Sequence, residues 1–184
     1  MGKDNVSEKS LEREIYFSIF KSAIGSCGIS WNEKGIVCFQ LPESSKIKTR
    51  QRFIEKGYIR ESSPPRWVHK TIDRIKRHLD GSVQDFSDVL LDIGNVPPFY
   101  LRVYNATRTI PSGQTKTYGQ IAKQIQSPHA ARAVGQALGR NPVGLIVPCH
   151  RVVSSSGKKL GGFSAFGGLA TKAKLLKIER VILP

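Results

Sequence analysis

The chain has 184 residues, an apolar content of 39% and a formal net charge of +15. This length allows one domain or two small ones, and the ordinary apolar content argues against a disordered protein. No stretch approaches the roughly 18 consecutive apolar residues of a membrane span, and the charged first residues exclude a secretory signal peptide.

The three cysteines, Cys27, Cys38 and Cys149, have no C-x-x-C spacing and no histidine partners at the intervals of zinc modules. We therefore expect no metal, no other cofactor and no disulfide framework. Cys27 and Cys38 are interpreted as small buried hydrophobic residues. Free cysteines indicate a reducing compartment, which is the cytoplasm, or the nucleus if the source is eukaryotic.

Residues 1–94 have the pattern of a small mixed α/β domain. The opening residues are polar and are predicted to be frayed. Four segments beyond them carry the signals of regular elements: a β-hairpin over 27–41, a modest helix over 43–58, a stronger helix between the N-cap Ser63 and the stop signal Gly81, and a further strand over 86–93.

Residues 95–184 form a second, mainly helical domain that begins at the junction "GNVPP". Its predicted helices cover 98–110, 117–125, 130–140 and 167–182. The second and third are short and are separated by a tight break, which is typical of a helix-turn-helix. A buried strand or core segment is predicted over 143–147.

Most of the positive charge lies in this second domain. Residues 1–98 carry 16 Lys and Arg and 13 Asp and Glu, whereas residues 99–184 carry 13 Lys and Arg and a single acid, Glu179. Such an imbalance is typical of a polyanion-binding protein. Nucleic acid is favoured over membrane because no basic amphipathic helix with a broad apolar face is present; a merely solvated basic surface is the alternative.

The helix over 130–140 begins with small residues, Ala130 and Ala131, and has Gly135 one turn later. Small side chains allow the helix backbone to come close to DNA, and they leave Arg132 as the one long side chain that could enter the duplex. Close approach with almost no base-reading side chains favours binding at any sequence. Tight helix packing would explain the same small residues.

The segment "NPVGLIVPCHRVV" places Cys149 beside two candidate cations, His150 and Arg151. Neighbouring positive charge lowers the pKa of a thiol, and a histidine can accept its proton. Because adjacent side chains point in different directions, His150 would need a bridging water or a bend after Pro148. Glu179 is the candidate partner of the histidine, although a surface glutamate paired with nearby lysines is the simpler alternative.

"PCHRVV" resembles the active-site signature of the O6-alkylguanine-DNA alkyltransferases, the methylated-DNA–protein-cysteine methyltransferases. The segments "TIPSGQTKTYGQIA", "AARAVGQALGRNPV" and "GGFSAFGGLATKAKLLKIE" resemble other blocks of this family, in order and near the expected spacing. The resemblance is strong over about residues 97–180. It implies an N-terminal ribonuclease H-like unit with a three-stranded antiparallel sheet, followed by a winged-helix-like helix-turn-helix domain.

The resemblance also implies a reaction. The protein would flip O6-methylguanine, and also O4-methylthymine, out of the duplex and transfer the alkyl group irreversibly to Cys149, once per molecule. His150 would act through water, Glu179 would complete the relay, and Asn141 would brace the active-site turn. The partner would be double-stranded DNA, bound as a monomer through the minor groove and largely independent of sequence.

The remaining roles concern the base and the duplex. Tyr118 would lie near the target base and its 3′ phosphate. Arg132 would replace the extruded nucleotide in the stack. The small residues that would contact DNA around it are Ala130, Ala131 and Gly135. The residues expected to line the base pocket are Tyr118, Val152, Phe163 and Ser164, with Phe166 competing with Ser164 for its place.

Two alternatives differ in chemistry. A helix-turn-helix or alkyltransferase-like protein would bind DNA or lesions without repair, but such alkyltransferase relatives lack the acceptor cysteine that this chain has. A cysteine hydrolase would need an oxyanion site, and no segment of the sequence indicates one.

Overall fold

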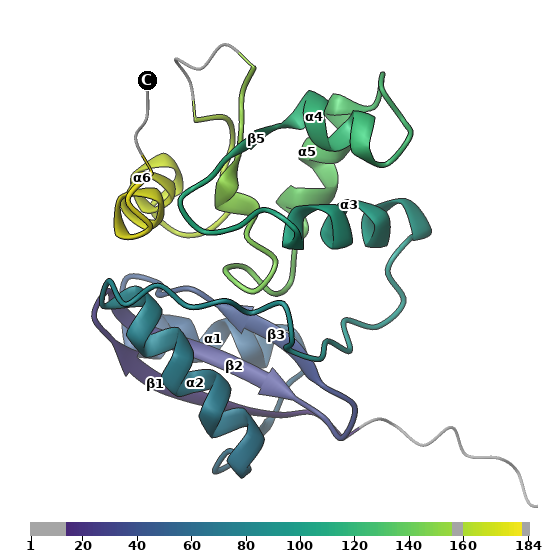
Figure 1. The fold of residues 1–184 in the computed structure, drawn as a ribbon. Helices are drawn as coiled ribbons and strands as arrows, with labels where there is room; N and C mark the ends of the chain where they lie inside the picture. The colour runs from purple at the N-terminus through teal and green to yellow at the C-terminus, as the bar shows by residue number, and fades with distance from the viewer. Residues whose placement is uncertain (1–13, 156–159, 182–184) are drawn as a thin grey trace, which may run out of the picture.

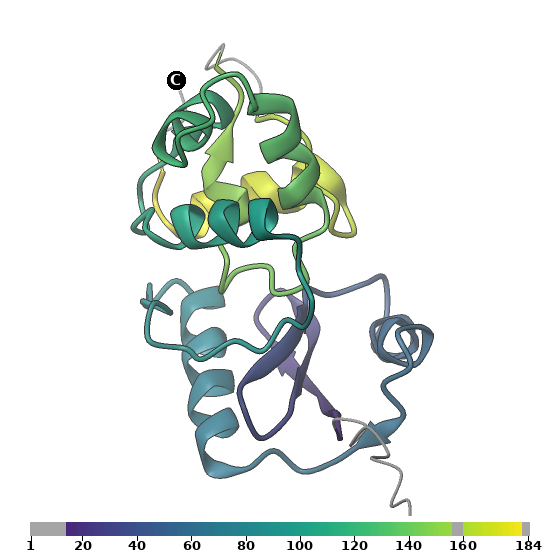
Figure 2. The ribbon, with the colours of Figure 1, turned by 90° about the vertical axis from the view of Figure 1, so that its right-hand side faces the viewer.

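The computed structural model describes residues 14–155 and 160–181. The opening segment, which was predicted to be frayed, and the last residue of the helix predicted over 167–182 lie outside these residues. Figures 1 and 2 show a sheet-containing N-terminal part next to a mainly helical C-terminal part. None of the helices in the described part combines the length and the apolar character needed to cross a bilayer.

The N-terminal sheet has three long antiparallel strands, β1 (Tyr16–Ser22), β2 (Gly25–Trp31) and β3 (Ile36–Gln40). The predicted hairpin is confirmed as β2 and β3, in which Ile29 pairs with Phe39. Successive residues are buried on both faces of β2, the central strand of the pair, and β3 is buried as well although it lies at the edge of the sheet. The short β4 (Arg60–Glu61) pairs in parallel with β1, which gives the order β3-β2-β1-β4. Neither β1 nor β4 was among the segments predicted individually.

Two helices cover the two faces of this sheet, α1 (Lys46–Glu55) and α2 (Arg66–Leu79) (Figure 2). The predicted N-cap of the second helix is wrong, because the N-cap is Pro65 rather than Ser63. A residue before proline is disfavoured in the helical conformation, so the Pro64–Pro65 pair keeps the chain extended and delays the helix.

The strand predicted over residues 86–93 is also wrong. Within it, Leu91 forms only an isolated bridge with Ile36 at the start of β3. Phe86 and Val89 are the buried apolar residues here, whereas Leu90 is exposed. A spacing of three between buried residues does not fit the alternation of a strand, and the segment follows the sheet as an irregular connection.

The C-terminal part contains the helices expected from the sequence: α3 (Pro98–Arg108), α4 (Tyr118–Gln124), α5 (Ala131–Gly139) and α6 (Gly168–Ile178). A capping box fixes the start of α4, because Thr117 Oγ1 accepts a hydrogen bond from the Gln120 amide while Gln120 Oε1 accepts one from the Thr117 amide. The helices α4 and α5 pack together as the helix-turn-helix. The 3-10 turn η1 (Cys149–Arg151) and the parallel pair β5 (Lys116–Thr117) and β6 (Val152–Val153) complete the unit.

The apolar run over 143–147 is a buried irregular loop rather than a strand. Leu145 has a φ of 69°, and the loop closes on itself through a bridge between Gly144 and Val147. The adjoining Pro142 carbonyl accepts a hydrogen bond of 2.9 Å from the Phe39 amide of β3. Since buried apolar residues of both parts also form one continuous core, this loop holds η1 against the N-terminal sheet.

Candidate active site

Cys149 is the first residue of η1 and follows directly on the buried loop. Its side chain is partly buried and faces a cavity of about 750 Å³. Helices α4 and α5 form one wall of this cavity, and the segments after β6 and around residue 163 form the other. Its lining includes Tyr118, Arg132, Gly135, Cys149, Phe163 and Ser164.

Asn141 holds the loop that leads to Cys149. Its Nδ2 donates to the Val147 carbonyl at 2.8 Å, and its Oδ1 accepts from the Val143 amide at 3.1 Å. One amide side chain therefore ties both ends of the apolar run together. This is the geometry of a brace, and the same side chain also lies close enough to the thiol to affect its pKa.

The environment of Cys149 favours the neutral thiol at rest. Burial raises its pKa, while the Asn141 side chain, the Lys172 ammonium and the amides of residues 149 and 150 act in the opposite direction without cancelling the effect of burial. A thiol in such a site needs a base before it can act as a nucleophile.

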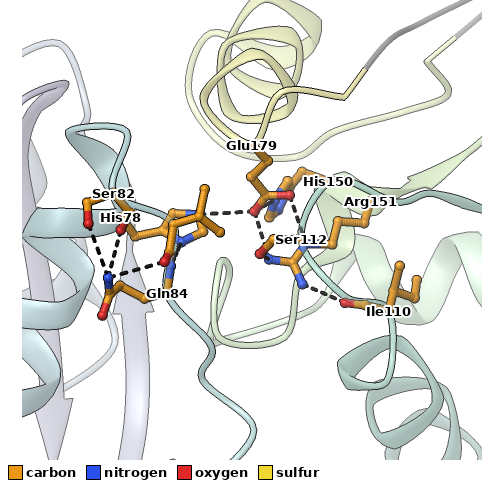
Figure 3. A network of polar contacts seen from close by, with 9 residues as sticks. His78, Ser82, Gln84, Ile110, Ser112, His150, Arg151 and Glu179 are labelled. Carbon is orange, nitrogen blue, oxygen red and sulfur yellow. Dashed lines mark hydrogen bonds and ion pairs between the residues drawn. The ribbon is translucent and has the colours of Figure 1, made fainter.

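His150 is the candidate base of this site, and its hydrogen-bond partner is Glu179 (Figure 3). His150 Nε2 lies 2.9 Å from Glu179 Oε1, and both side chains are fully buried. Glu179 is the C-cap residue of α6 and not the surface glutamate of the simpler interpretation. Burial alone would raise the pKa of this carboxyl, but hydrogen bonds from His150, His78 and Arg151 outweigh burial and hold the pKa well below its usual range.

His150 is poised to accept a proton on its other nitrogen. Burial lowers the pKa of its ring against the opposing effect of Glu179, so the neutral imidazole is favoured. The Nδ1 atom is buried and has no hydrogen-bond partner in the part of the chain that the structure describes. No direct hydrogen bond between Cys149 and His150 is present among these residues either, so a proton would have to pass through a bridging water.

Arg151, the second candidate cation beside Cys149, is a structural residue. Its side chain is 7% exposed and makes a two-pronged contact with Glu179, from Nε at 2.9 Å and from Nη2 at 2.8 Å. It also donates to the Ile110 carbonyl and to the Ser112 hydroxyl. A guanidinium that is fully engaged in this way holds the carboxylate in one orientation.

Lys172 also belongs to the site, although no sequence motif predicted it. It is fully buried on α6, and its Nζ donates to the Val152 carbonyl at 2.6 Å. Burial lowers its pKa to about 8, although Cys149 acts in the opposite direction. A signal was available, because Lys172 occupies the same helix face as the buried Leu175, Leu176 and Glu179.

Tyr118 forms the wall of the cavity next to Cys149. Its hydroxyl donates to the Gly162 carbonyl at 3.4 Å, and the Lys172 Nζ lies 5.9 Å from the centre of its ring. Gly161 has a φ of 75°, and a Cβ added there would lie 2.8 Å from the Tyr118 ring. A Cβ added at Gly135 of α5 would lie 3.7 Å from the same ring.

The other predicted pocket residues differ in position. Phe163 and Ser164 line the cavity, whereas Phe166 is half exposed and lies outside the lining. Val152 is fully buried and does not line the cavity, because its side chain points into the core from β6; it reaches the site through its carbonyl, which binds Lys172.

The residues predicted to meet DNA lie at the start of α5. Ala130 is the N-cap, and Ala131 follows at the rim of the cavity. The Arg132 side chain is exposed at this rim, next to the opening that leads to Cys149.

Known proteins are similar to this chain over most of its length. A family model described as the DNA-binding domain of 6-O-methylguanine DNA methyltransferase matches residues 98–181. A methylated-DNA–protein-cysteine methyltransferase of Methanosarcina acetivorans is 36% identical over 167 residues, which cover 90% of this chain and 98% of the relative. The chain belongs to the methylated-DNA–protein-cysteine methyltransferase family. A second member, from Methanosarcina mazei, is 38% identical with similar coverage, 90% of this chain and 97% of that protein.

Solved structures of the methylated-DNA–protein-cysteine methyltransferase family have the same fold. The O6-methylguanine methyltransferase of Mycobacterium tuberculosis aligns with a TM-score of 0.72 and 32% identity, over 90% of this chain and 93% of that one. A structure of the Mycobacterium tuberculosis protein OGT in complex with DNA aligns with a TM-score of 0.72 and 34% identity, over 90% and 92%. The likeness therefore includes both parts of the chain.

Proposed function

We propose that this protein repairs alkylated DNA by moving the alkyl group from O6 of guanine to the sulfur of Cys149. The observation that carries the proposal is the position of Cys149 at a cavity, with the buried His150–Glu179 pair directly behind it. Membership of the family and the relative solved in complex with DNA support DNA as the substrate.

The chemistry balances without a cofactor. The thiol proton passes through water to His150, and the thiolate then attacks the methyl carbon in line with the bond to O6. The carbon–oxygen bond breaks, guanine leaves with the electron pair, and the Tyr118 hydroxyl is the proposed source of the proton for the departing base. The proton that His150 took from Cys149 then returns through water to the tyrosinate, so protons balance. Burial raises the pKa of Tyr118 and so keeps the hydroxyl protonated. The thioether cannot be reversed by thiol exchange, so each molecule reacts once.

Access to O6 requires the nucleotide to leave the stack. We propose that α5 enters the minor groove, that Arg132 fills the space left by the extruded base, and that the small residues around it keep binding nearly independent of sequence. The same chemistry extends to O4-methylthymine, which presents a methyl group on an equivalent oxygen. A monomer is sufficient, because every residue of the proposed site belongs to one chain.

Replacement of the acceptor tests the proposal. Duplex DNA with one O6-methylguanine is incubated with the protein, and the bases are then analysed by chromatography. We expect guanine to be restored by the unmodified protein and by Cys27→Ala, which removes a buried thiol outside the cavity. Cys149→Ala should leave the lesion intact. Repair by Cys149→Ala at the normal rate would refute the assignment.

A further inference from the structure

The N-terminal part contributes a second histidine to the buried carboxylate. His78 lies in the last turn of α2 and is fully buried. Its Nε2 lies 3.0 Å from Glu179 Oε1, although the two residues are 101 positions apart in the sequence (Figure 3). The contact joins the N-terminal part directly to the group that supports His150.

Neighbouring groups fix the tautomer of His78. The backbone amide of Gln84 donates to Nδ1 at 3.1 Å, so Nδ1 acts as an acceptor and carries no hydrogen. The ring proton is therefore on Nε2, which donates to the carboxylate. The Phe86 ring packs against the imidazole at 5.4 Å, with an interplanar angle of 55°, and limits its rotation. His78 is thus an Nε2–H donor held in one orientation.

His78 and His150 use the same oxygen of Glu179. Oε1 accepts from His78, from His150 at 2.9 Å and from Arg151 at 2.8 Å, whereas Oε2 accepts from Arg151 alone among the described residues. The titratable and charged side chains that meet on Glu179 are therefore His78, His150 and Arg151. Each hydrogen bond that Oε1 accepts reduces the negative charge on this oxygen. If one donor were lost, Oε1 would become more basic and would bind the hydrogen atoms of the remaining donors more strongly.

We propose that His78 is a positioning residue of the alkyl-transfer site, in which its Nε2–H fixes Glu179 and keeps the carboxylate ionised beside a neutral His150. The inference rests on the function proposed above. It gives the N-terminal part a role in the relay. Glu179, the only acid of residues 99–184, is bound by His78 of the N-terminal part as well as by His150 and Arg151 of the C-terminal part. His78 would act through Glu179 and His150 without touching the substrate.

Three variants separate this role from simple packing. His78→Leu removes the donor and keeps an apolar side chain in the core. His78→Gln keeps an N–H that can reach Glu179, so this conservative variant should restore the rate that His78→Leu loses. His69→Leu makes the same change at an exposed position of the same helix and is the matched control.

Two measurements are made on the full chain over a range of pH. The first is the rate of carboxamidomethylation of Cys149 by iodoacetamide, followed by peptide mass. The second is the single-turnover rate of methyl transfer at saturating O6-methylguanine duplex, together with the Kd for that duplex. The iodoacetamide reaction needs no alkylated DNA, so it reports on the relay even if the proposed function fails.

For His78→Leu we expect a loss of about tenfold in the single-turnover rate at pH 7, the size expected for one hydrogen bond to a charged group. The acid limb of both pH profiles should move to higher pH, because His150 would hold its proton more tightly beside a more basic Glu179. The Kd should stay unchanged. His78→Gln should recover the rate to within about threefold, and His69→Leu should match the unmodified protein in every readout.

Unchanged pH profiles for a folded His78→Leu would overturn the inference, as would equal losses in His78→Leu and His78→Gln. If His78→Leu does not fold, the ring nitrogens of the unmodified protein are examined by NMR. A proton on Nε2 of His78 supports the inference, and a proton on Nδ1 overturns it. Absence of methyl transfer by the unmodified protein, with a shifted iodoacetamide profile in His78→Leu, would reject the proposed function alone.

Discussion

The surroundings of Cys149 favour the neutral thiol, because burial raises its pKa. We propose that His150, whose Nδ1 has no hydrogen-bond partner among the described residues, takes the thiol proton. A resting thiol is less open to unwanted oxidation and alkylation than a thiolate. This suits a residue that can be used once, because a cysteine lost to a side reaction would inactivate the molecule.

Arg132 provides a test of base flipping at the level of one residue. We expect Arg132→Ala to slow methyl transfer from duplex DNA by about tenfold or more, because an extruded base leaves an unstacked gap that costs a few kcal/mol. The reaction with free O6-benzylguanine should be almost unchanged, since a free base needs no flipping. Single-turnover rates on the two substrates measure the difference.

Arg140→Ala is the matched control for this prediction. Arg140 is an exposed arginine at the other end of α5, so its loss removes the same charge from the same helix. We expect it to weaken duplex binding slightly and to leave the rate at saturating DNA unchanged. Equal losses for Arg132→Ala on both substrates, or equal effects of the two variants, would contradict the role of Arg132.

At the scale of the elements, the sequence predicts the helices of the C-terminal part well. Helix caps and apolar spacing are local signals in the sequence. A proline at the first position of a helix is one of them, and α3 begins at Pro98. Long-range pairing is not local, which explains the missed β4 and the false strand over 86–93. The loop over 143–147 was ambiguous for the same reason, because an apolar run shows burial without showing shape.

The candidate site was predictable where its residues are unusual in the sequence. Glu179 stands out as the one acid of its half, and the structure brings it to His150. The sequence does not predict that Lys172 and His78 belong to the site, because lysine and histidine side chains on a helix are usually exposed or buried without a functional partner. Their roles depend on contacts across the fold, and a sequence without its fold does not contain those contacts.

The variant Gly161→Ala tests how tightly the loop around residue 161 packs against Tyr118 at the wall of the cavity. The φ of Gly161 is 75°, and a Cβ would meet the Tyr118 ring at 2.8 Å, so Gly161→Ala should displace this loop or the ring. We expect a loss of about 1–3 kcal/mol in the free energy of unfolding, and a larger fractional loss in the rate of alkyl transfer. Urea unfolding and single-turnover kinetics measure the two effects.

Gly162→Ala is the natural control for Gly161→Ala. It lies next in the chain, and a Cβ there would have no neighbour within 4 Å among the described residues. Its stability and rate should stay close to those of the unmodified protein. A Gly161→Ala protein with unchanged stability and rate would contradict the close packing of the pocket wall.

At the scale of the whole molecule, the two parts of the chain work as one unit. They share a continuous core, the Phe39 amide binds the Pro142 carbonyl, and His78 binds Glu179. The positive charge is concentrated in the C-terminal part, whereas the N-terminal part is nearly balanced. We interpret the C-terminal part as the DNA-facing side and the N-terminal part as its rigid support.

The central claim is that Cys149 accepts one alkyl group and is not regenerated. Its most direct test is the mass of the peptide that contains Cys149, measured after incubation with an excess of duplex DNA carrying O6-methylguanine. We predict that this peptide gains the mass of one methyl group and that one lesion is repaired per protein molecule. An unmodified Cys149 peptide beside repaired DNA, or several lesions repaired per molecule, would contradict the claim.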